Sequence, residues 1–153
     1  MVENRKLWKN FLSQSFLAAV TVFLVLFVIT IENSVVIAAI GATAFIVFAM
    51  PKSITARPRN VIGGHLIGLT LGSLCALIPQ QSFLHSAFAY SLAVGLSTLT
   101  MVVTDTEHPP AASTALGVAI TGFSLSVVTA VITSIILLSL AHRILRPFLK
   151  DLV

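Results

Sequence analysis

The chain alternates between long runs of apolar residues and short polar stretches. Residues 12–31 contain no charged side chain, and neither do residues 34–50, 61–78 or 83–103. A helix needs about 20 mainly apolar residues to cross the ~30 Å hydrocarbon layer of a membrane. Polar or proline-containing stretches separate the runs. This pattern predicts four helices, each close to the length of a membrane crossing.

The apolar run after residue 109 is too long for a single crossing. Residues 110–141 would form a helix of about 48 Å at 1.5 Å per residue, against a ~30 Å layer. We expect a break at Thr121-Gly122, which leaves a short helix over residues 110–120 and a full crossing over residues 123–141. The short helix measures only about 17 Å, so it must begin below the membrane surface. The chain is therefore predicted to be an all-α integral membrane protein with five to six helices.

Composition supports this fold class. The chain is 57% hydrophobic and 9% charged, with a mean hydropathy of +1.04. A soluble domain carries about 25% charged residues. We expect one transmembrane domain over residues 1–153, with no separate soluble module. Cys75 is the single cysteine, so no intramolecular disulfide and no multi-cysteine metal site is expected.

The basic residues predict the orientation of the chain. They form three groups: Arg5, Lys6 and Lys9; Lys52, Arg57 and Arg59; and Arg143, Arg146 and Lys150. Such groups at the ends of apolar runs fit cytoplasmic loops better than a nucleic-acid surface. With a break at residues 121–122, both termini and the 52–60 loop lie in the cytoplasm. Residues 12–78 and 83–141 then run in opposite orientations, which is the arrangement of an inverted repeat.

Residues 104–113 form a polar turn between two apolar runs. His108 precedes two prolines, which favours an extended residue followed by the first turn of a helix. The free N–H groups and the dipole of such a helix favour an anion. The charge of a histidine can change near neutral pH, so His108 could act with Asp105 and Glu107 in gating or a proton relay. The acids could instead form a solvated loop or a helix N-cap, and no metal is predicted, because one histidine and two carboxylates are weak evidence.

Residues 61–78 carry a stripe of glycines beside a histidine. Gly64, Gly68 and Gly72 are spaced by four, so they share one helix face and let another helix of the same chain or of a second subunit approach closely. His65 lies beside this stripe. A histidine in a membrane span faces the interior or a water path, or it is a packed side chain bonded to a backbone carbonyl. Asn60 is expected to cap the helix.

The candidate substrate-binding residues combine helix ends, hydroxyls and imidazoles. Basic residues before the third span either set the topology or gather anions by charge attraction. Hydroxyls in the apolar segments either bond to their own helix or line a path for a small polar solute; they are Thr43, Ser97, Thr98, Thr100, Thr104, Ser113 and Thr114. The residues predicted to bind substrate are His108, Pro109, Pro110, Thr104, Thr106, Ser113, Arg57, Asn60 and His65.

Two blocks of sequence resemble a known family. One is His108-Pro109-Pro110-Ala111 after Met101, and the other is Ala56-Arg57-Pro58-Arg59-Asn60 before Gly64-His65 and Gly68. With Gly41-Ala42-Thr43 and Pro51, they resemble the HPP family of integral membrane proteins over residues 35–140. The resemblance implies four or more membrane spans, and plant and cyanobacterial members are associated with nitrite transport. No transit peptide is recognised before the first span, so we expect a bacterial inner membrane.

Three functions stay open from the sequence. The first is a transporter or channel for a small inorganic anion, with nitrite as the candidate. The second is a proton-coupled carrier of another small solute, and the third is a membrane scaffold or sensor subunit that does not transport. No enzyme activity and no cofactor are expected, since no nucleophile or metal constellation is visible. A chain this small leaves little bulk around a path, so a homodimer or larger closed homo-oligomer is expected in the lipid membrane.

Overall fold

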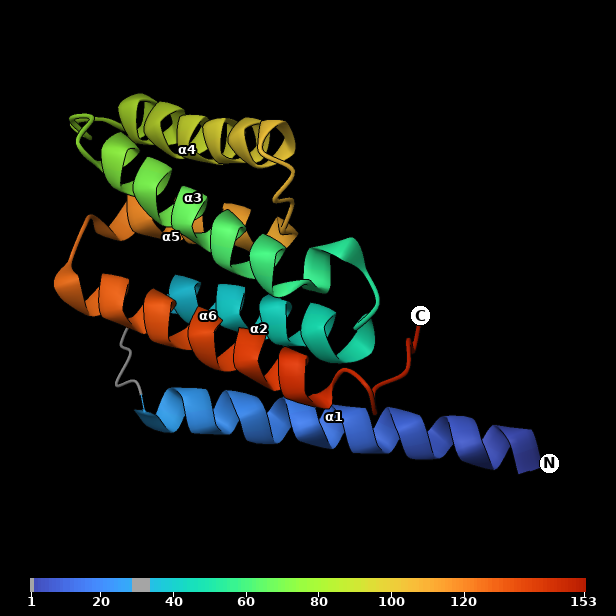
Figure 1. Ribbon diagram of the computed structural model, residues 1–153. Helices are drawn as coiled ribbons and strands as arrows, with labels where there is room; N and C mark the ends of the chain where they lie inside the picture. Colours follow the sequence, from blue (N-terminus) through green and yellow to red (C-terminus); the bar gives the residue numbers. More distant parts are fainter. Residues whose placement is uncertain (1, 29–33) are drawn as a thin grey trace.

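The computed structural model describes residues 2–28 and 34–153, and the side chains of residues 7–27 and 37–153. These residues form helices and turns without a strand, which confirms the all-α class. The elements are α1 (Val2–Val28), α2 (Ser34–Ala49), the short 3-10 helix η1 (Ile54–Ala56), α3 (Pro58–Ala76), α4 (Phe83–Val103), α5 (Pro109–Thr121) and α6 (Leu125–Leu145) (Figure 1).

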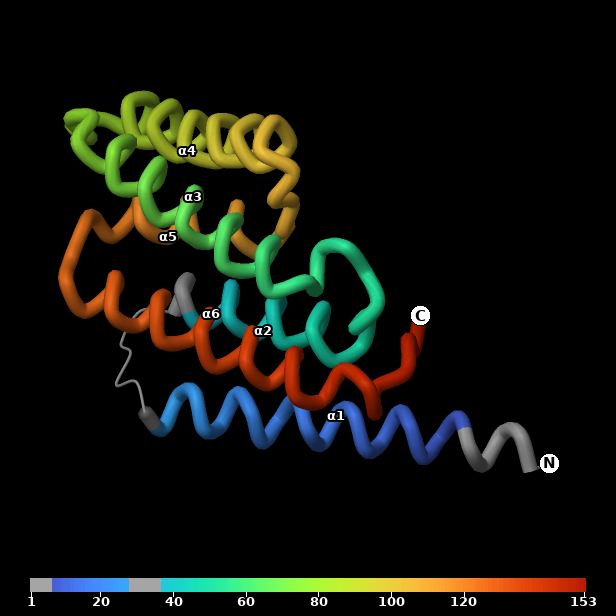
Figure 2. The backbone as a smooth tube through the Cα atoms, in the orientation of Figure 1, coloured from blue at the N-terminus to red at the C-terminus, as the bar shows by residue number. Residues whose placement is uncertain are grey.

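The helices lie side by side in stacked rows. Figure 2 shows α4 at one side, followed by α3 and α5, then α2 and α6, and α1 at the opposite side. The same order follows from the packing, since α5 contacts α3, α4 and α2, whereas α1 contacts α2 and α6. Helix α5 therefore lies in the middle of the bundle, and α1 and α4 are its outer members.

The predicted break after the short helix is confirmed. Helix α5 ends at Thr121, and Gly122 adopts a φ of 79°, which L side chains rarely adopt. Ser124 then caps α6 by accepting a hydrogen bond from the Val127 N–H at 3.2 Å. The 13 residues of α5 span about 20 Å, which is too short to cross a ~30 Å layer.

Most predicted spans agree with the observed helices, but the predicted cap of the third span is wrong. Helix α4 coincides with the predicted span, and α2 ends immediately before Met50-Pro51. Helix α3 begins at Pro58 with Arg57 as its N-cap residue, since proline is well suited to the first helical turn. Asn60 lies inside that turn and donates through Nδ2 to the Glu107 carbonyl oxygen at 3.2 Å. The predicted turn at residues 32–33 lies outside the described residues.

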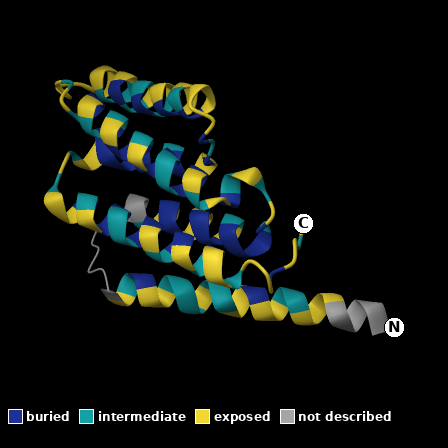
Figure 3. Cartoon of the chain, in the orientation of Figure 1, coloured by how far each residue is buried: buried dark blue, intermediate teal, exposed yellow. Residues whose placement is uncertain are grey.

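Within the described parts of the chain, three helices are long and apolar enough to cross a membrane. They are the stretches Leu7–Phe27 of α1, Phe83–Val103 (α4) and Leu125–Leu145 (α6), while the apolar part of α2, Ile37–Ala49, is shorter. Figure 3 shows exposed residues along α1 and α4, and these include Phe27 at 78% and Phe83 at 89% exposure. Large apolar side chains on an outer surface are what lipid requires, so the chain is a multi-pass membrane protein.

One end of the bundle gathers both termini. Figure 1 places the N-terminus of α1, the C-terminal tail, the 51–57 loop and the 104–108 turn at this end, which we call the basic end. All three predicted basic groups lie in these segments or in the helix turns next to them. The turns at residues 77–82 and 122–124 lie at the other end. The shared location agrees with termini on one side of the membrane. The cytoplasmic location of that side and the inverted repeat stay predictions.

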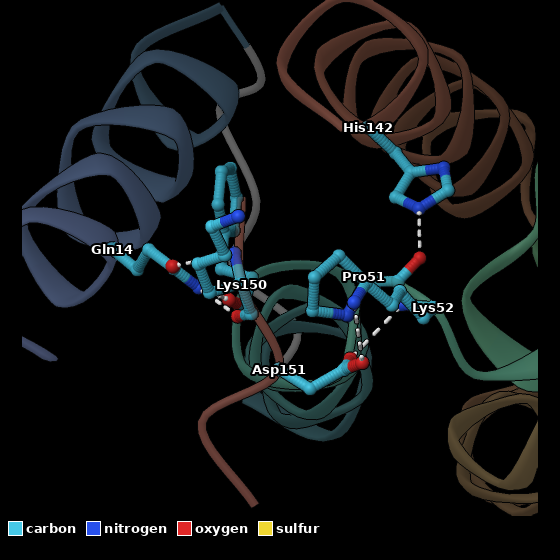
Figure 4. Close-up of polar contacts among 7 residues, drawn as sticks. Gln14, Pro51, Lys52, His142, Lys150 and Asp151 are labelled. Atoms are coloured by element: carbon cyan, nitrogen blue, oxygen red, sulfur yellow. Dashed lines mark hydrogen bonds and ion pairs between the residues drawn. The ribbon is translucent and has the colours of Figure 1, made fainter. Parts of the chain in front are cut away.

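Polar contacts fasten the C-terminal tail at the basic end (Figure 4). Gln14 of α1 accepts from the Lys150 N–H at 2.8 Å and donates to the carbonyl oxygens of Phe48 and Lys150. Asp151 accepts from the backbone N–H of Lys52 at 3.1 Å. Because Gln14 is only 3% exposed, its amide satisfies backbone groups that water does not reach. The tail thereby joins α1 to the end of α2.

The glycine stripe faces α5. A Cβ atom added at Gly64 would lie 2.8 Å from the Cβ of His108, and one added at Gly72 would lie 2.5 Å from the Ala115 carbonyl oxygen. At Gly68 the added atom would collide with the Ala111 carbonyl oxygen. The stripe therefore serves packing within the chain. It lets α3 and α5 approach closely and fixes where His108 lies.

Candidate functional site

Two histidines and two threonines from three helices form a buried hydrogen-bonded group, which we call the His–Thr cluster. Its members are Thr43 of α2, His65 of α3, His108 before α5 and Thr114 of α5. The Thr43 hydroxyl oxygen lies 2.9 Å from His65 Nε2 and 3.0 Å from His108 Nε2. Thr114 Oγ1 lies 2.8 Å from His65 Nδ1. The two imidazole rings are 5.0 Å apart between centroids, with Thr43 bridging them.

Local backbone geometry places His108 at this position. It has φ −145° and ψ 93°, the extended form that a following proline favours. Its side chain makes no N-cap hydrogen bond to α5. Instead its Nδ1 reaches the Thr55 carbonyl oxygen of η1 at 2.8 Å. A carbonyl oxygen only accepts, so Nδ1 carries a hydrogen, and Nε2 remains free to contact Thr43.

The His–Thr cluster is sealed from the surface. His108 and Thr43 are 0% exposed, Thr114 is 1% and His65 is 2% exposed. A cavity of about 10 Å³ adjoins the cluster, lined by Thr43, His65, Thr114 and Ser134 together with aliphatic side chains of α2 and α6. A cavity of this size has room for about one water molecule. The cluster thus borders water-sized space in the middle of an apolar bundle, and the surface exposed to that space is apolar.

The 104–107 turn is tied to the start of α3. Arg59 donates to the Thr104 carbonyl oxygen at 3.2 Å and pairs with the Asp105 carboxylate at 3.5 Å. Asp105 has a φ of 55° and lies on the surface. Thr106 is buried, and its hydroxyl lies 2.8 Å from that of Thr104. This turn closes the basic end over the His–Thr cluster.

The predicted site residues lie partly inside and partly outside the His–Thr cluster. His65 and His108 lie in the cluster, and Pro110, which is buried, fixes the first turn of α5 behind them. Asn60 holds the 104–107 turn through Glu107. The remaining candidates lie outside the cluster, as they are exposed, half-buried or bonded only within the turn: Arg57, Thr104, Asp105, Thr106, Glu107, Pro109 and Ser113.

The predicted proton relay through the two acids is not assembled in the structure. Within the described residues, no hydrogen bond or ion pair joins Asp105 or Glu107 side chains to His108. Asp105 faces solvent with Arg59 as its partner. Both ring nitrogens of His108 have other partners, Thr43 and Thr55. The Thr43 hydroxyl connects His108 to the second histidine, His65.

Thr43 and Thr114 were expected only as two hydroxyls among several, and the Thr55 carbonyl was not expected at all. One signal singles out Thr43, because it is the only side chain with a polar group in residues 35–50. A lone hydroxyl in an otherwise apolar buried helix needs a partner. No comparable signal marks a backbone carbonyl such as that of Thr55. Among the described side chains, no three histidines, cysteines or carboxylates lie together in a way that could hold a metal ion.

Comparisons with known proteins place the chain among transmembrane proteins. It is 38% identical over 85 residues to one transmembrane protein of Dictyostelium discoideum, covering 56% of this chain and 30% of that protein. It is 32% identical over 104 residues to a second from the same organism, covering 67% of this chain and 33% of that one. The chain thus spans about a third of the length of these relatives. No solved structure matches it. Residues 3–148 match the family described as "HPP, transmembrane region", and the chain belongs to this HPP transmembrane family.

Proposed function

We propose that this chain moves a small inorganic anion across the membrane, with nitrite as the first candidate. The observation that carries the proposal is the His–Thr cluster: two imidazoles and two hydroxyls, nearly fully buried in an apolar bundle. Ionisable side chains inside a membrane protein are costly and mark substrate or ion pathways. Imidazole and hydroxyl groups replace the hydration of a small anion without a fixed charge strong enough to trap it. The resemblance to nitrite-transporting HPP proteins supports the choice of substrate.

Charge at the basic end supports an anionic substrate. Among the described side chains, the exposed cations there are Lys9, Lys52, Arg57, Arg59, Arg143, Arg146 and Lys150. The carboxylates of Asp105 and Asp151 are each paired with one of them. The remaining positive charge attracts anions toward the bundle. We place this end in the cytoplasm, as the distribution of basic residues favours, and the protein in a bacterial inner membrane.

In this proposal the structure represents a state that is closed to the anion, because the cavity is too small. Space for about one water does not admit nitrite, which has three heavy atoms. Helices around the cavity must therefore separate for the anion to reach His65.

Homo-oligomerisation is part of the proposal, but the glycine stripe would not supply the interface. Gly64, Gly68 and Gly72 already pack against α5 of the same chain. A second subunit would instead contact an outer helix such as α4, which is apolar and exposed. Light scattering in detergent measures the mass of the protein complex. A dimer or larger closed assembly is expected, and a monomer would contradict this part of the proposal.

Nitrite uptake into proteoliposomes tests the function. Vesicles with the purified protein should take up nitrite at least about tenfold faster than protein-free vesicles if the protein transports nitrite across the membrane. Vesicles with the His65→Gln variant should lose most of this rate, while His85→Gln, an exposed histidine on α4, should keep it. Folded protein without nitrite uptake would favour the scaffold or sensor function. Uptake of other solutes but not of nitrite would favour the carrier of another solute.

A further inference from the structure

The His–Thr cluster has fewer hydrogens than hydrogen-bonding contacts. Five contacts join it together and to two backbone carbonyls: Thr43 to Ala39 O, to His65 and to His108, His65 to Thr114, and His108 to Thr55 O. A neutral imidazole has one N–H, and each threonine has one O–H. Four hydrogens are therefore available for five contacts when both imidazoles are neutral.

Acceptors determine where the four hydrogens lie. Thr55 O only accepts, so the His108 hydrogen is on Nδ1 and its Nε2 is a lone pair. Of the two His65 tautomers, the one with its hydrogen on Nε2 fills more of the contacts, since His65 then donates to Thr43 and accepts at Nδ1 from Thr114. The single Thr43 hydrogen must then serve both the Ala39 carbonyl oxygen and His108 Nε2. One of these two contacts lacks a hydrogen.

One added proton completes the network at a single position. Placed on His108 Nε2, it makes that nitrogen a donor to Thr43, and the Thr43 hydroxyl is free to donate to Ala39 O. Thr43 then accepts two hydrogen bonds and donates one, which is the full capacity of a hydroxyl. Placed on His65 Nδ1 instead, the proton would meet Thr114 and leave the contact at Thr43 unfilled. The geometry therefore selects His108.

Among the described side chains, no carboxylate forms a hydrogen bond or ion pair that would balance a positive charge at His108. On the segments around the cluster the carboxylates are Asp105, exposed and paired with Arg59, and Glu107, which makes no ion pair. Helices α2 and α5 carry no charged side chain in their described parts. The other titratable groups of the surrounding segments are Lys52, Arg57, Cys75, His142 and Arg143. An unpaired charge buried in this apolar interior is costly.

An anion at the adjoining cavity would balance that charge. The cavity is lined by Thr43, which directly contacts His108 Nε2, and by His65. Each ion thereby lowers the cost of burying the other, and such coupling is reciprocal. We propose that the His–Thr cluster binds one proton at His108 Nε2 together with the anion, so that the chain carries anion and proton as a neutral pair.

This coupling rests on the proposed anion transport and adds its stoichiometry. The only bond that forms on entry is N–H at His108 Nε2, and the same bond breaks on the far side as the proton follows the anion. No other covalent change occurs. Charge balances, because one proton and one monovalent anion cross together.

The test uses the wild-type protein in proteoliposomes with nitrite and a pH-sensitive dye inside. Initial rates are corrected with protein-free vesicles, which report the leak of nitrous acid itself. We expect a proton gradient of about one pH unit, acid outside, to raise protein-dependent uptake several-fold, with inward proton movement matching nitrite. A membrane potential that would accumulate a lone anion about tenfold should leave the initial rate unchanged. Uptake that follows the potential and ignores the proton gradient overturns the coupling and leaves the proposed function intact, whereas no protein-dependent uptake overturns the function itself.

Variants at the bridge between the histidines provide a second readout. Thr43→Val keeps the shape and removes the hydroxyl, so proton-driven uptake should fall at least about tenfold. Thr43→Ser keeps the hydroxyl and should retain most of the uptake and its proton dependence. Thr129→Val removes an exposed hydroxyl that bonds to its own helix, and it is the matched control. Equal proton dependence in Thr43→Val and Thr129→Val would overturn the proposed role of the bridge.

Discussion

Helices α4 and α5 follow each other in the chain, yet the same types of residue have different surroundings in the two helices. The Ser91 hydroxyl on α4 donates to the Ala87 carbonyl of its own helix at 2.7 Å, and Gly95 on α4 faces open space. The Thr114 hydroxyl on α5 instead reaches His65 on another helix. Figure 3 shows the same difference as an exposed α4 and a largely buried α5. A hydroxyl or glycine in a membrane helix therefore has functional meaning only in combination with the surface that it faces.

The largest expected effect concerns glycines. Gly68→Leu would drive a side chain into the α5 backbone at Ala111, where nothing can move aside. Overpacking costs ~1–3 kcal/mol, and more against rigid backbone, so we expect loss of a monodisperse protein in size-exclusion chromatography. Gly95→Leu, with no atom within 4 Å of the added Cβ, is the control and should purify normally. Equal stability of the two variants would show that α3 and α5 are not held together by the stripe.

The next effect concerns hydroxyls. Thr114→Val removes the hydrogen that His65 Nδ1 accepts, so nitrite uptake should fall about tenfold, equivalent to ~1.4 kcal/mol for one lost hydrogen bond. Thr98→Val, at an exposed position on α4, should change uptake by less than about twofold. Initial rates in proteoliposomes at matched protein content measure both. Similar losses in the two variants would contradict the distinction between inner and outer hydroxyls.

An effect on stability rather than on uptake is expected where an outer helix carries a buried polar group. Gln14→Leu on α1 leaves backbone groups of Phe48 and Lys150 without partners, which costs ~1–3 kcal/mol. A thermal melt in detergent should show a lower midpoint than that of the wild type. The exposed Gln81→Leu is the control and should leave the midpoint unchanged. An unchanged midpoint for Gln14→Leu would mean that the tail does not fasten α1.

The smallest effect is expected at the surface pair of the polar turn. Asp105→Asn removes the charge but keeps a residue type that tolerates positive φ. The carboxylate is 78% exposed and pairs with Arg59 over 3.5 Å, so solvent screens the pair. Nitrite uptake and its pH dependence should match those of the wild type. A strong loss of uptake would restore Asp105 to the proton path.

The sequence predicted what depends on local pattern. Apolar runs located the helices, and the excess length after Pro110 together with Thr121-Gly122 located the break that Gly122 makes with its positive φ. The two proline-containing blocks were sufficient to indicate the family, which the match over residues 3–148 confirms. These features need only neighbouring residues, which is why they can be read from one sequence.

The composition of the site could not be predicted in the same way. Thr43, His65 and Thr114 meet across sequence separations of 22 and 49 residues, which only the packing of α2, α3 and α5 defines. Asn60 was expected as a cap because its residue type favours that position, but Pro58 already begins the helix. The acids beside His108 were expected to act with it, yet the reversal at Asp105 turns that carboxylate outward.

The most direct test of the His–Thr cluster as the transport site is nitrite uptake by His108→Gln from about pH 5.5 to about pH 8, the range in which histidine titrates. Glutamine keeps a hydrogen-bonding side chain but cannot take up the proton. The account predicts that His108→Gln loses at least about tenfold in rate and that its remaining uptake no longer depends on pH beyond the protein-free leak. The His85→Gln control should behave as the wild type. A His108→Gln protein with unchanged rate and unchanged pH dependence would contradict the account.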